Sequence, residues 1–370
     1  MPLGIYIHVP FCARKCGYCD FYSVEKLDKM APFLSALDRE VLSTFTEEAA
    51  PVPADTLYVG GGTPSLVPAG ALEQLLTLLQ TRVQFKEGAE ITLECNPGSP
   101  VVERAAAWRA MGFNRISVGA QSFRETDLHF LNRIHTAEQT EASVQALRDA
   151  GFGNINLDLI FSLPGQTASA FQDNLRRALA LNVEHLSVYG LSVEPGTPLA
   201  HRQEKGEFTR VNDETYEAHF LTAHGTLTSN GYHHYEISNY ARPGFESRHN
   251  WNYWHEGDYV GLGASAHSKI GNRRWANVMG LDTYVKDPMK KAFTETLSDK
   301  ERRMERIMLQ LRTSAGIDKG ECGGRRTVDR LLRKGWLVET PDRLVLTAEG
   351  MLLIDEITLL LEGDACLTSN

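Results

Sequence analysis

Short apolar runs alternate with longer helical patterns through the first half of the chain. The runs are rich in β-branched residues, and each is followed by a polar turn and a stretch with apolar residues at helical spacing. This order of elements is typical of a parallel sheet with crossover helices. Strands are predicted at residues 4–11, 55–59, 90–94, 115–118, 154–161 and 185–189. Helices are predicted at residues 31–46, 71–80, 102–111, 137–149 and 168–181.

Six such units predict an α/β fold with a barrel-like sheet, either closed or partial. A flat, doubly wound sheet is the alternative, because it uses the same order of elements.

The pattern changes in the second half of the chain. After a turn cluster at 194–198 and a predicted helix at 213–230, residues 231–269 are rich in aromatic side chains and punctuated by glycine. Beyond residue 280 we predict helices at 299–312 and 327–334, a two-stranded ribbon at 336–339 and 343–346, and a final helix at 348–361. Helices followed by a short hairpin resemble a winged-helix fold.

The chain is therefore divided into three predicted parts. Residues 1–230 form the barrel, residues 231–280 form an aromatic and histidine-rich segment that covers it, and residues 281–370 form a small helical, winged-helix-like domain.

The charge balance argues against a large phosphate-binding surface. The 370 residues include 38 Lys and Arg against 47 Asp and Glu, which gives a net charge of −9. Duplex DNA binding depends on neutralising phosphates with Lys and Arg, so no nucleic-acid partner is expected. Residues 1–11 lack the pattern of a secretory signal, and no apolar run approaches the ~18 residues of a transmembrane helix. A cytoplasmic protein with reduced cysteines is expected.

Three cysteines near the start of the chain carry the strongest chemical signal. Cys12, Cys16 and Cys19 have the spacing C-x3-C-x2-C. Cysteine thiolates are the usual ligands of iron–sulfur clusters, and three of them can hold three irons of a cubane while the fourth iron stays open. A zinc site completed by a distant fourth ligand is the alternative. Structural zinc sites usually combine two cysteine pairs, and the sequence has no second pair.

Polar or glycine-rich positions follow the other predicted strands. In β/α barrels the loops after the strands gather at one rim, where active sites lie. Gly60–Gly62 permit close approach of the backbone to a ligand, Glu94 ends the third strand and Gln121 lies just beyond the fourth. Asp158 interrupts an apolar run, where an unpaired carboxylate is costly to bury. The sequence therefore predicts a ligand site at this rim.

Several motifs of the chain resemble those of a known family. Residues 5–12 with the three cysteines are similar to the radical S-adenosylmethionine (SAM) superfamily. The similarity continues in the motifs at 60–64, 94–97, 116–123, 131–135, 158–165, 235–241 and 249–254. Within the superfamily, the chain resembles the group that contains oxygen-independent coproporphyrinogen III oxidase and its haem-chaperone relatives of the HemW type. The family fold is a partial (β/α)6 barrel.

The resemblance implies a cofactor site residue by residue. Cys12, Cys16 and Cys19 match the ligands of a 4Fe–4S cluster, whose open iron chelates the amino and carboxylate groups of S-adenosyl-L-methionine. Residues matching the family's SAM contacts, or contacts to a second SAM, are Tyr6, Tyr18, Gly61, Gly62, Thr63, Glu94, Gln121, Arg133 and Asp158.

Two departures from the oxidase favour the chaperone branch. The oxidase has a further cysteine two residues after the third ligand, where this chain has Phe21. The oxidase also has a substantial extension before its first strand, whereas this chain enters the strand at Gly4. We therefore expect haem delivery rather than conversion of propionates to vinyl groups. Anaerobic coproporphyrinogen III dehydrogenation is the alternative function.

The segment 249–254 matches the H-N-x-x-Y-W motif of the chaperone branch. The resemblance makes His249 the candidate haem ligand, and imidazole is a common axial ligand of haem iron. The alternative is a loop histidine hydrogen-bonded to the backbone. Further candidate ligands, not ranked by the sequence, are His233, His234, His255 and His267.

The resemblance also implies partners. These are haem as cargo, acceptor haem proteins such as respiratory cytochromes, and an electron donor such as flavodoxin or ferredoxin. A homodimer and a transient membrane association are compatible with it.

Overall fold

The computed structural model describes residues 3–46, 50–322 and 324–367. Six parallel strands lie side by side in chain order and form the centre of one large sheet. They are β1 (Leu3–Val9), β2 (Val52–Gly61), β3 (Val83–Cys95), β4 (Arg115–Gln121), β5 (Ile155–Phe161) and β6 (His185–Gly190). The first six predicted strands are thereby confirmed, although β3 begins earlier than predicted.

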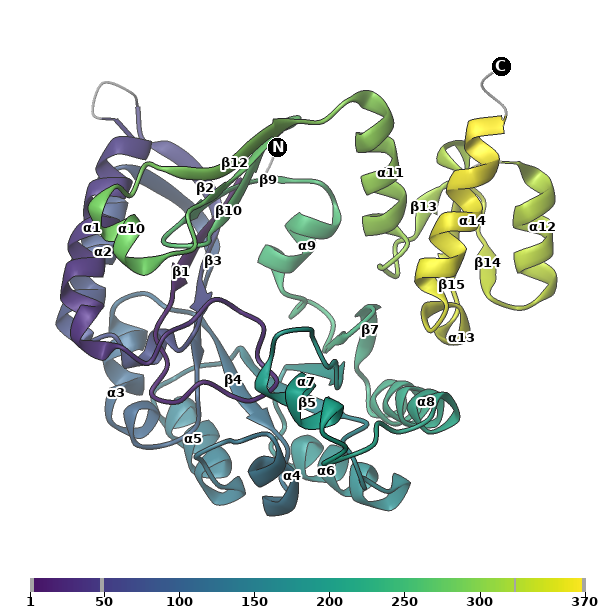
Figure 1. The fold of residues 1–370 in the computed structure, drawn as a ribbon, viewed down its shortest axis with the longest axis horizontal. Coiled ribbons are helices and arrows are strands. Elements are labelled where there is room, and N and C mark those ends of the chain that lie inside the picture. Colours follow the sequence, from purple (N-terminus) through teal and green to yellow (C-terminus); the bar gives the residue numbers. More distant parts are fainter. Residues whose placement is uncertain (1–2, 47–49, 323, 368–370) are drawn as a thin grey trace.

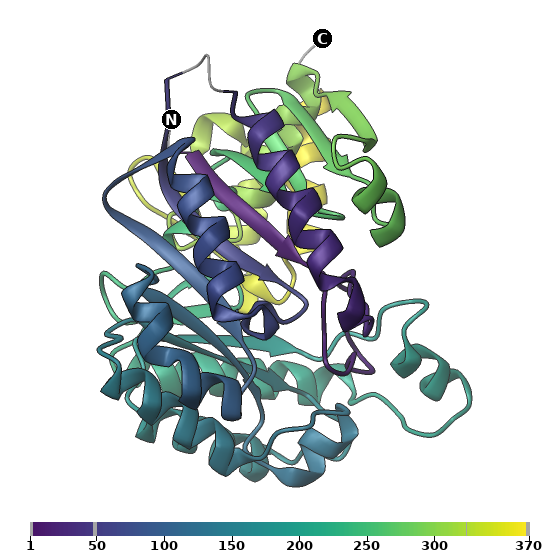
Figure 2. The ribbon, with the colours of Figure 1, turned by 90° about the vertical axis from the view of Figure 1, so that its left-hand side faces the viewer.

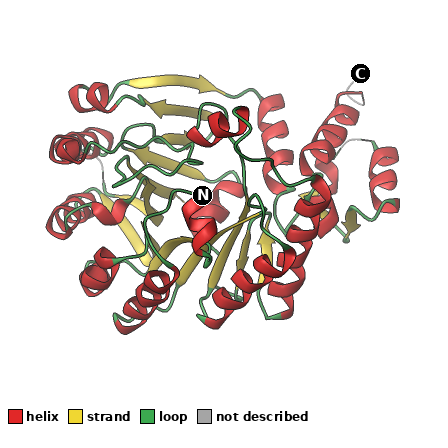
Figure 3. Ribbon diagram, turned by 60° about the horizontal axis from the view of Figure 1, so that its bottom comes forward, coloured by secondary structure: helices red, strands yellow, loops and turns green. Residues whose placement is uncertain are grey.

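Helices follow these strands, and all but α7 (Pro198–Glu204), which lies at the rim of the barrel (Figure 1), pack on the outside of the curved sheet (Figure 3). They are α1 (Met30–Thr44), α2 (Ala69–Gln80), α3 (Ser99–Ala110), α4 (Glu125–Phe130), α5 (Ala137–Asp149), α6 (Ala168–Ala180), α7 and α8 (Asp213–Ser229). Thr136, Thr167 and Asn212 accept backbone N–H bonds at the starts of α5, α6 and α8. These side chains satisfy N–H groups that have no partner within the helix.

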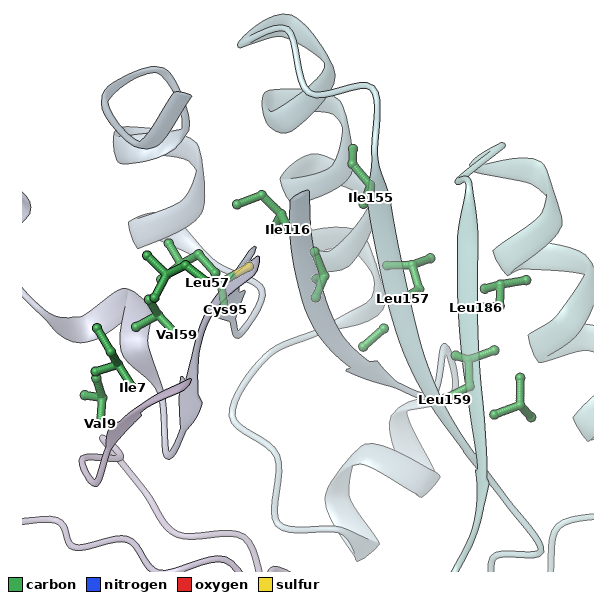
Figure 4. Packing of buried hydrophobic residues seen from close by; sticks show 14 of the residues in the cluster. Ile7, Val9, Leu57, Val59, Cys95, Ile116, Ile155, Leu157, Leu159 and Leu186 are labelled. Atoms are coloured by element: carbon green, nitrogen blue, oxygen red, sulfur yellow. The ribbon is translucent and has the colours of Figure 1, made fainter. Parts of the chain in front are cut away.

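The alternation of side chains along each strand explains the two faces of the sheet. Apolar residues such as Ile7, Leu57, Ile116 and Leu157 point outward against the helices and are fully buried (Figure 4). Cys95 belongs to the same cluster, as expected for a small buried hydrophobe. The inner face is the polar one, and it lines the interior of the barrel.

The sheet continues beyond the six parallel strands at both edges. Its order is β12-β11-β10-β9-β1-β2-β3-β4-β5-β6-β8-β7. The added strands are β7 (His233–Glu236), β8 (Asn239–Ala241), β9 (Asp258–Leu262), β10 (His267–Ile270), β11 (Arg273–Asn277) and β12 (Lys291–Thr296). β9 is parallel to β1, and the other five run antiparallel to their neighbours. Because β12 and β7 do not pair with each other, the barrel is partial rather than closed.

Helix α9 (Arg248–Trp254) lies inside the curve of the sheet (Figure 1). It contacts β1, β2 and β9, so the predicted covering segment enters the barrel as well as extending its sheet. Helix α10 (Leu281–Lys286) packs against α1 on the outside. The sheet therefore extends past the predicted boundary at residue 281, and the three-part division of the chain stays a prediction.

The C-terminal region has the helical, winged-helix-like pattern that the sequence predicts. Its elements are α11 (Asp299–Gln310), β13 (Ile317–Asp318), α12 (Arg325–Arg333), β14 (Leu337–Glu339), β15 (Arg343–Leu346), α13 (Ala348–Met351) and α14 (Ile354–Leu367). Two details differ from the prediction. The ribbon gains a third strand, β13, which is too short to give a periodic signal. The predicted final helix is broken, because the N–H of Leu353 bonds to Gly350 three residues earlier and tightens the turn.

Among the described residues, no helix combines the length and apolar character needed to cross a membrane.

Candidate functional site

The cysteine loop begins where β1 ends, at the carboxyl edge of the sheet. Its base is closed by two backbone bonds, from Cys12 N–H to Val24 O (3.0 Å) and from Val24 N–H to Pro10 O (2.8 Å). The thiols of Cys12, Cys16 and Cys19 are free. Leu199, in α7, donates its N–H to Gly17 O at 2.8 Å, so α7 supports the loop from outside (Figure 2).

Two polar side chains from the barrel rim contact the thiols. The Thr63 hydroxyl, just after β2, lies 3.6 Å from Cys12 Sγ. The Arg133 guanidinium, in the loop after α4, lies 3.4 Å from Cys16 Sγ. Both side chains therefore orient sulfur atoms of the cysteine loop.

The three thiols fit a cubane better than a single ion. In the described part of the chain, no group of three His, Cys, Asp or Glu side chains converges tightly enough to hold one metal ion. An iron–sulfur cubane places each cysteine on a different iron, so its ligands need not converge on one point. The free thiols, the arginine and the hydroxyl suit a 4Fe–4S cluster, and the identity of the metal site stays a prediction.

Arg133 joins this loop to the rim of the sheet. Its Nη2 donates to Asn96 Oδ1 at 2.5 Å and to Gly119 O at 2.7 Å. Asn96 in turn donates to the Thr63 hydroxyl at 3.0 Å. The ends of β2, β3 and β4 are thus linked into one network around the cysteines. The structure thus brings Thr63 and Arg133 together beside the cysteine loop, and their role in cofactor binding stays a prediction.

Glu94, near the end of β3, faces the glycine turn. It accepts the Tyr58 hydroxyl at 2.7 Å and the Gly61 N–H at 3.1 Å. Burial raises the pKa of Glu94 to about 7, although both hydrogen bonds act in the opposite direction. Gly61 has a φ of 111°, and a Cβ on Gly62 would lie 2.6 Å from Phe11 O. Glycine is therefore required here, and the turn leaves backbone exposed beside a carboxyl group.

Gln121 and Asp158 complete the rim on β4 and β5. A Cβ on Gly119 would meet Gln121 Nε2 at 3.0 Å and Arg133 at 3.2 Å, so both side chains lie over this glycine. Asp158 accepts from Asn156 at 2.7 Å and from Ser117 at 3.3 Å. Burial raises the pKa of Asp158 despite these bonds. The Asp158 carboxyl is thus paired, as its position in an apolar run requires.

The two predicted tyrosines lie at different sides of the site. The charges of Arg133, Cys16 and Asp158 all act on Tyr18, which places it among the rim residues. Tyr6, on β1, faces the barrel interior with its hydroxyl 3.1 Å from His8 Nδ1 and its ring 6.2 Å from that of Tyr58. Whether each residue contacts a cofactor stays a prediction.

Three polar residues of this interior were not singled out from the sequence. Tyr58 and Asn96 hold Glu94, Thr63 and Arg133 in place, as described above. Each lies two residues from a predicted position, Gly60 or Glu94, and so shares its face of the strand. Arg115, at the start of β4, is buried near Glu90 and Tyr58. That inner-face alternation is the signal that could have found them.

His249 is buried inside the barrel, with only 1% of its surface exposed. Its Nδ1 lies 2.7 Å from the Thr56 hydroxyl, and its Nε2 lies 2.8 Å from the Tyr253 hydroxyl. Burial lowers the pKa of His249 to about 3, and the charge of Arg115 adds to this effect. Both ring nitrogens have partners in this conformation, so ligation of haem iron by His249 requires one bond to open. Its role as a ligand stays a prediction.

A cavity of about 490 Å³ lies beside the inner face of β1, β9 and β10, flanked by α9 and α11. We call it the flank cavity. It is lined by Tyr6, His8, Asp20, Phe21, Tyr22, Tyr253, Glu256, Gly257, Tyr259, Ser265, His267, Lys269, Met279, Glu305 and Leu309. These residues come from β1, the cysteine loop, the end of α9, the β9–β10 region, the segment after β11 and α11. The flank cavity therefore adjoins the cysteine loop.

Comparison with known proteins gives a consistent result. A model of the Radical SAM superfamily matches residues 6–178. The chain is 36% identical to the haem chaperone HemW of Mycobacterium tuberculosis, over 98% of this chain and 95% of the relative. It is 33% identical to HemW of Bacillus subtilis, over 95% of this chain and 97% of the relative.

A solved structure shares the whole fold. Coproporphyrinogen III oxidase (HemN) from Escherichia coli, a radical SAM enzyme, superposes with a TM-score of 0.84 at 25% identity. The match covers 98% of this chain and 90% of the oxidase. The partial barrel and the C-terminal helical region are thereby confirmed as one family architecture.

Proposed function

Because this chain belongs to the HemW family of haem chaperones within the radical SAM superfamily, we propose that it binds haem and transfers it to acceptor haem proteins such as respiratory cytochromes. The observation that carries the proposal is the similarity to HemW relatives along nearly the whole chain. The free thiols beside Arg133 and Thr63 support a role for the cofactor that the superfamily uses.

Cys12, Cys16 and Cys19 would hold a 4Fe–4S cluster, and S-adenosyl-L-methionine would occupy the open iron. When bound, this pair supplies one-electron chemistry at the sulfonium, with electrons from a donor such as flavodoxin or ferredoxin. Arg133 donates to Cys16 Sγ and to Asn96 Oδ1, and so positions both side chains. Thr63 donates to Cys12 and fixes the end of β2.

The remaining rim residues would bind the nucleotide. Gly61 and Gly62 present backbone close to the cysteine loop, and Glu94 offers an acceptor for an amine. Tyr6, Tyr18, Gln121 and Asp158 line the same rim and interior. Arg133 is planar and cationic, which suits a carboxylate, but it already contacts Cys16, Asn96 and Gly119 within the protein.

Coproporphyrinogen III dehydrogenation is the second candidate, because the chain shares the fold of HemN. Phe21 argues against this activity, because it stands where the oxidase has its further cysteine and so offers no thiol. Its side chain is 70% exposed. Reduced, reconstituted protein is incubated with coproporphyrinogen III and SAM. We expect no protoporphyrinogen; its formation would replace the chaperone proposal by the enzymatic one.

The chaperone proposal is tested by haem titration of protein reconstituted without oxygen, with and without SAM, followed by absorbance. We expect saturable binding of haem, and transfer of the bound haem to an apocytochrome. Protein that carries its cluster but binds no haem would refute the proposal. The same sample, examined by light scattering, reports whether loading produces a homodimer, and flotation with lipid vesicles reports membrane association.

A further inference from the structure

The flank cavity has the shape and lining of a site for a flat aromatic ligand. Its volume of about 490 Å³ falls within the range of about 300–1,000 Å³ that is usual for cofactor-sized ligands. Tyr253 and Tyr259 line it in an edge-to-face pair with centroids 4.6 Å apart. Aromatic side chains of this kind offer large apolar contact with fixed geometry.

Two large apolar side chains also line the cavity and extend into solvent. Phe21 is 70% exposed and Met279 is 59% exposed. Phe21 comes from the cysteine loop and Met279 from the segment after β11, far apart in the sequence. Exposed apolar groups gathered at one opening are typical of a binding site. They would cover a ring system that enters between them.

Two histidines line the flank cavity, and only one has free ring nitrogens. His8 is fully engaged, with Nδ1 at 3.1 Å from the Tyr6 hydroxyl and Nε2 at 2.8 Å from Tyr22 O. His267, on β10, is exposed, and no residue of the described chain hydrogen-bonds to its ring. Its ring contacts Phe293 at a centroid distance of 5.7 Å. His267 therefore offers an unoccupied imidazole beside the aromatic lining.

The other histidines suggested by the sequence do not line this cavity, although His233 and His255 have a partner at only one ring nitrogen. His233 lies 3.6 Å from a Glu246 oxygen. His234 Nδ1 lies 3.0 Å from the corresponding atom of His224, and His255 Nδ1 lies 3.0 Å from Trp251 O. His249 has both nitrogens engaged. The geometry thus ranks candidates that the sequence could not rank.

We propose that haem docks in the flank cavity with His267 as an axial ligand of its iron. This inference rests on the proposed haem-chaperone function and locates its cargo. The macrocycle would lie against the aromatic lining, covered by Phe21 and Met279. The lining carries Asp20, Glu256 and Glu305, so the anionic propionates would face the open mouth. Partial burial of the ring and the charge of Arg274 lower the pKa of His267, which favours the neutral ring that binds iron.

The test compares haem binding by the reconstituted wild-type protein with that of single variants. His267→Ala is expected to weaken haem binding at least tenfold and to remove the imidazole-ligated absorbance spectrum, which added imidazole restores. His267→Met keeps a side chain of similar bulk and is expected to change the spectrum to that of a thioether-ligated haem. Circular dichroism checks that each variant is folded.

The control is His255→Ala, because His255 is also exposed but lines a separate hollow beside α9. We expect His255→Ala to bind haem like the wild type. If the wild type binds no haem, the chaperone function fails. If it binds haem and both His267 variants keep the wild-type affinity and spectrum, the cavity assignment alone fails. Loss of the imidazole signature in His249→Ala, with His267→Ala unchanged, would instead favour the motif histidine.

Discussion

At the scale of single residues, Arg133 stands out because one guanidinium contacts the Cys16 thiol, the Asn96 amide and the Gly119 carbonyl. Replacing it by alanine removes the nearby positive charge and releases Asn96. Groups that orient a metal ligand commonly contribute roughly 10-fold or more to metal affinity. We therefore predict that Arg133→Ala retains its cluster roughly 10-fold less well under a chelator.

Iron and sulfide content after anaerobic reconstitution measures this effect. Arg176→Ala is the matched control, because Arg176 is exposed on α6 and pairs only with Asp173. Equal cluster retention in the two variants would show that Arg133 does not support the cysteine loop.

Glu236, at the end of β7, gives a prediction about pH. It is 1% exposed, and burial raises the pKa of this carboxyl from 4.5 to about 8. Between about pH 4.5 and 8, the folded state keeps a proton on Glu236 that the unfolded state has already lost. The free energy of unfolding therefore falls as the pH rises through this window. Glu236→Gln mimics the protonated carboxyl.

We expect the free energy of unfolding of Glu236→Gln to exceed that of the wild type by about 1–3 kcal/mol at pH 8. The difference should vanish or reverse near pH 4.5. Denaturant unfolding at several pH values measures it, and a difference that does not change with pH would contradict the assignment.

The sequence could identify side chains with chemistry of their own, but not those that position them. Glu94 and Arg133 belong to recognisable motifs. Asn96 and Tyr58 gain their roles only when neighbouring strands meet, because their partners lie 33 to 37 residues away in the chain. His249 illustrates the reverse case: its motif was visible, but its burial and its two engaged nitrogens were not.

At the scale of elements, the end of β2 is packed against the start of the cysteine loop without space for a side chain. A Cβ on Gly62 would lie 2.6 Å from Phe11 O, whereas a Cβ on Gly70, in the first turn of α2, meets nothing within 4 Å. Gly62→Ala should therefore destabilise the protein by about 1–3 kcal/mol and reduce cluster incorporation. Gly70→Ala should be neutral or stabilise by about 0.5–1 kcal/mol.

Thermal unfolding and iron content of the two variants provide the comparison. Both add a single methyl group, so only the space around it differs. If Gly62→Ala gave the same thermal stability and iron content as Gly70→Ala, the result would contradict the close contact between Gly62 and the start of the cysteine loop.

The six parallel strands were predictable because apolar, often β-branched residues recur at alternate positions along each of them. The added edge strands were not. β12 is exposed along most of its length, and β11 begins with Arg273 and Arg274. Edge strands of this kind show little apolar periodicity, since one face or both meet solvent. Their pairing follows from the neighbouring strand rather than from their own composition.

At the scale of the whole molecule, Arg306 ties the C-terminal region to the barrel. From α11 it donates to Glu256, just beyond α9, at 2.6 Å and to Glu321 at 2.7 Å. Arg306→Ala breaks both half-buried pairs at a cost of about 1–2 kcal/mol. We expect faster amide hydrogen exchange in residues 298–367, with little change in β2 to β6.

Arg302→Ala is the control, because it lies on the same helix and its exposed ion pair with Asp299 is long, at 4.0 Å. Hydrogen exchange followed by mass spectrometry separates the two regions. Identical exchange in the two variants would mean that the Arg306 contacts do not hold the C-terminal region in place.

Tyr22 connects the end of the cysteine loop to the body of the protein. The backbone carbonyl of Tyr22 lies 2.8 Å from His8 Nε2. The side-chain hydroxyl of Tyr22 accepts the Leu281 N–H at 2.7 Å. The end of the cysteine loop therefore also forms one side of the flank cavity. A change in the conformation of the cysteine loop at Tyr22 would therefore be transmitted directly to His8 and to the start of α10, without passing through the core of the barrel.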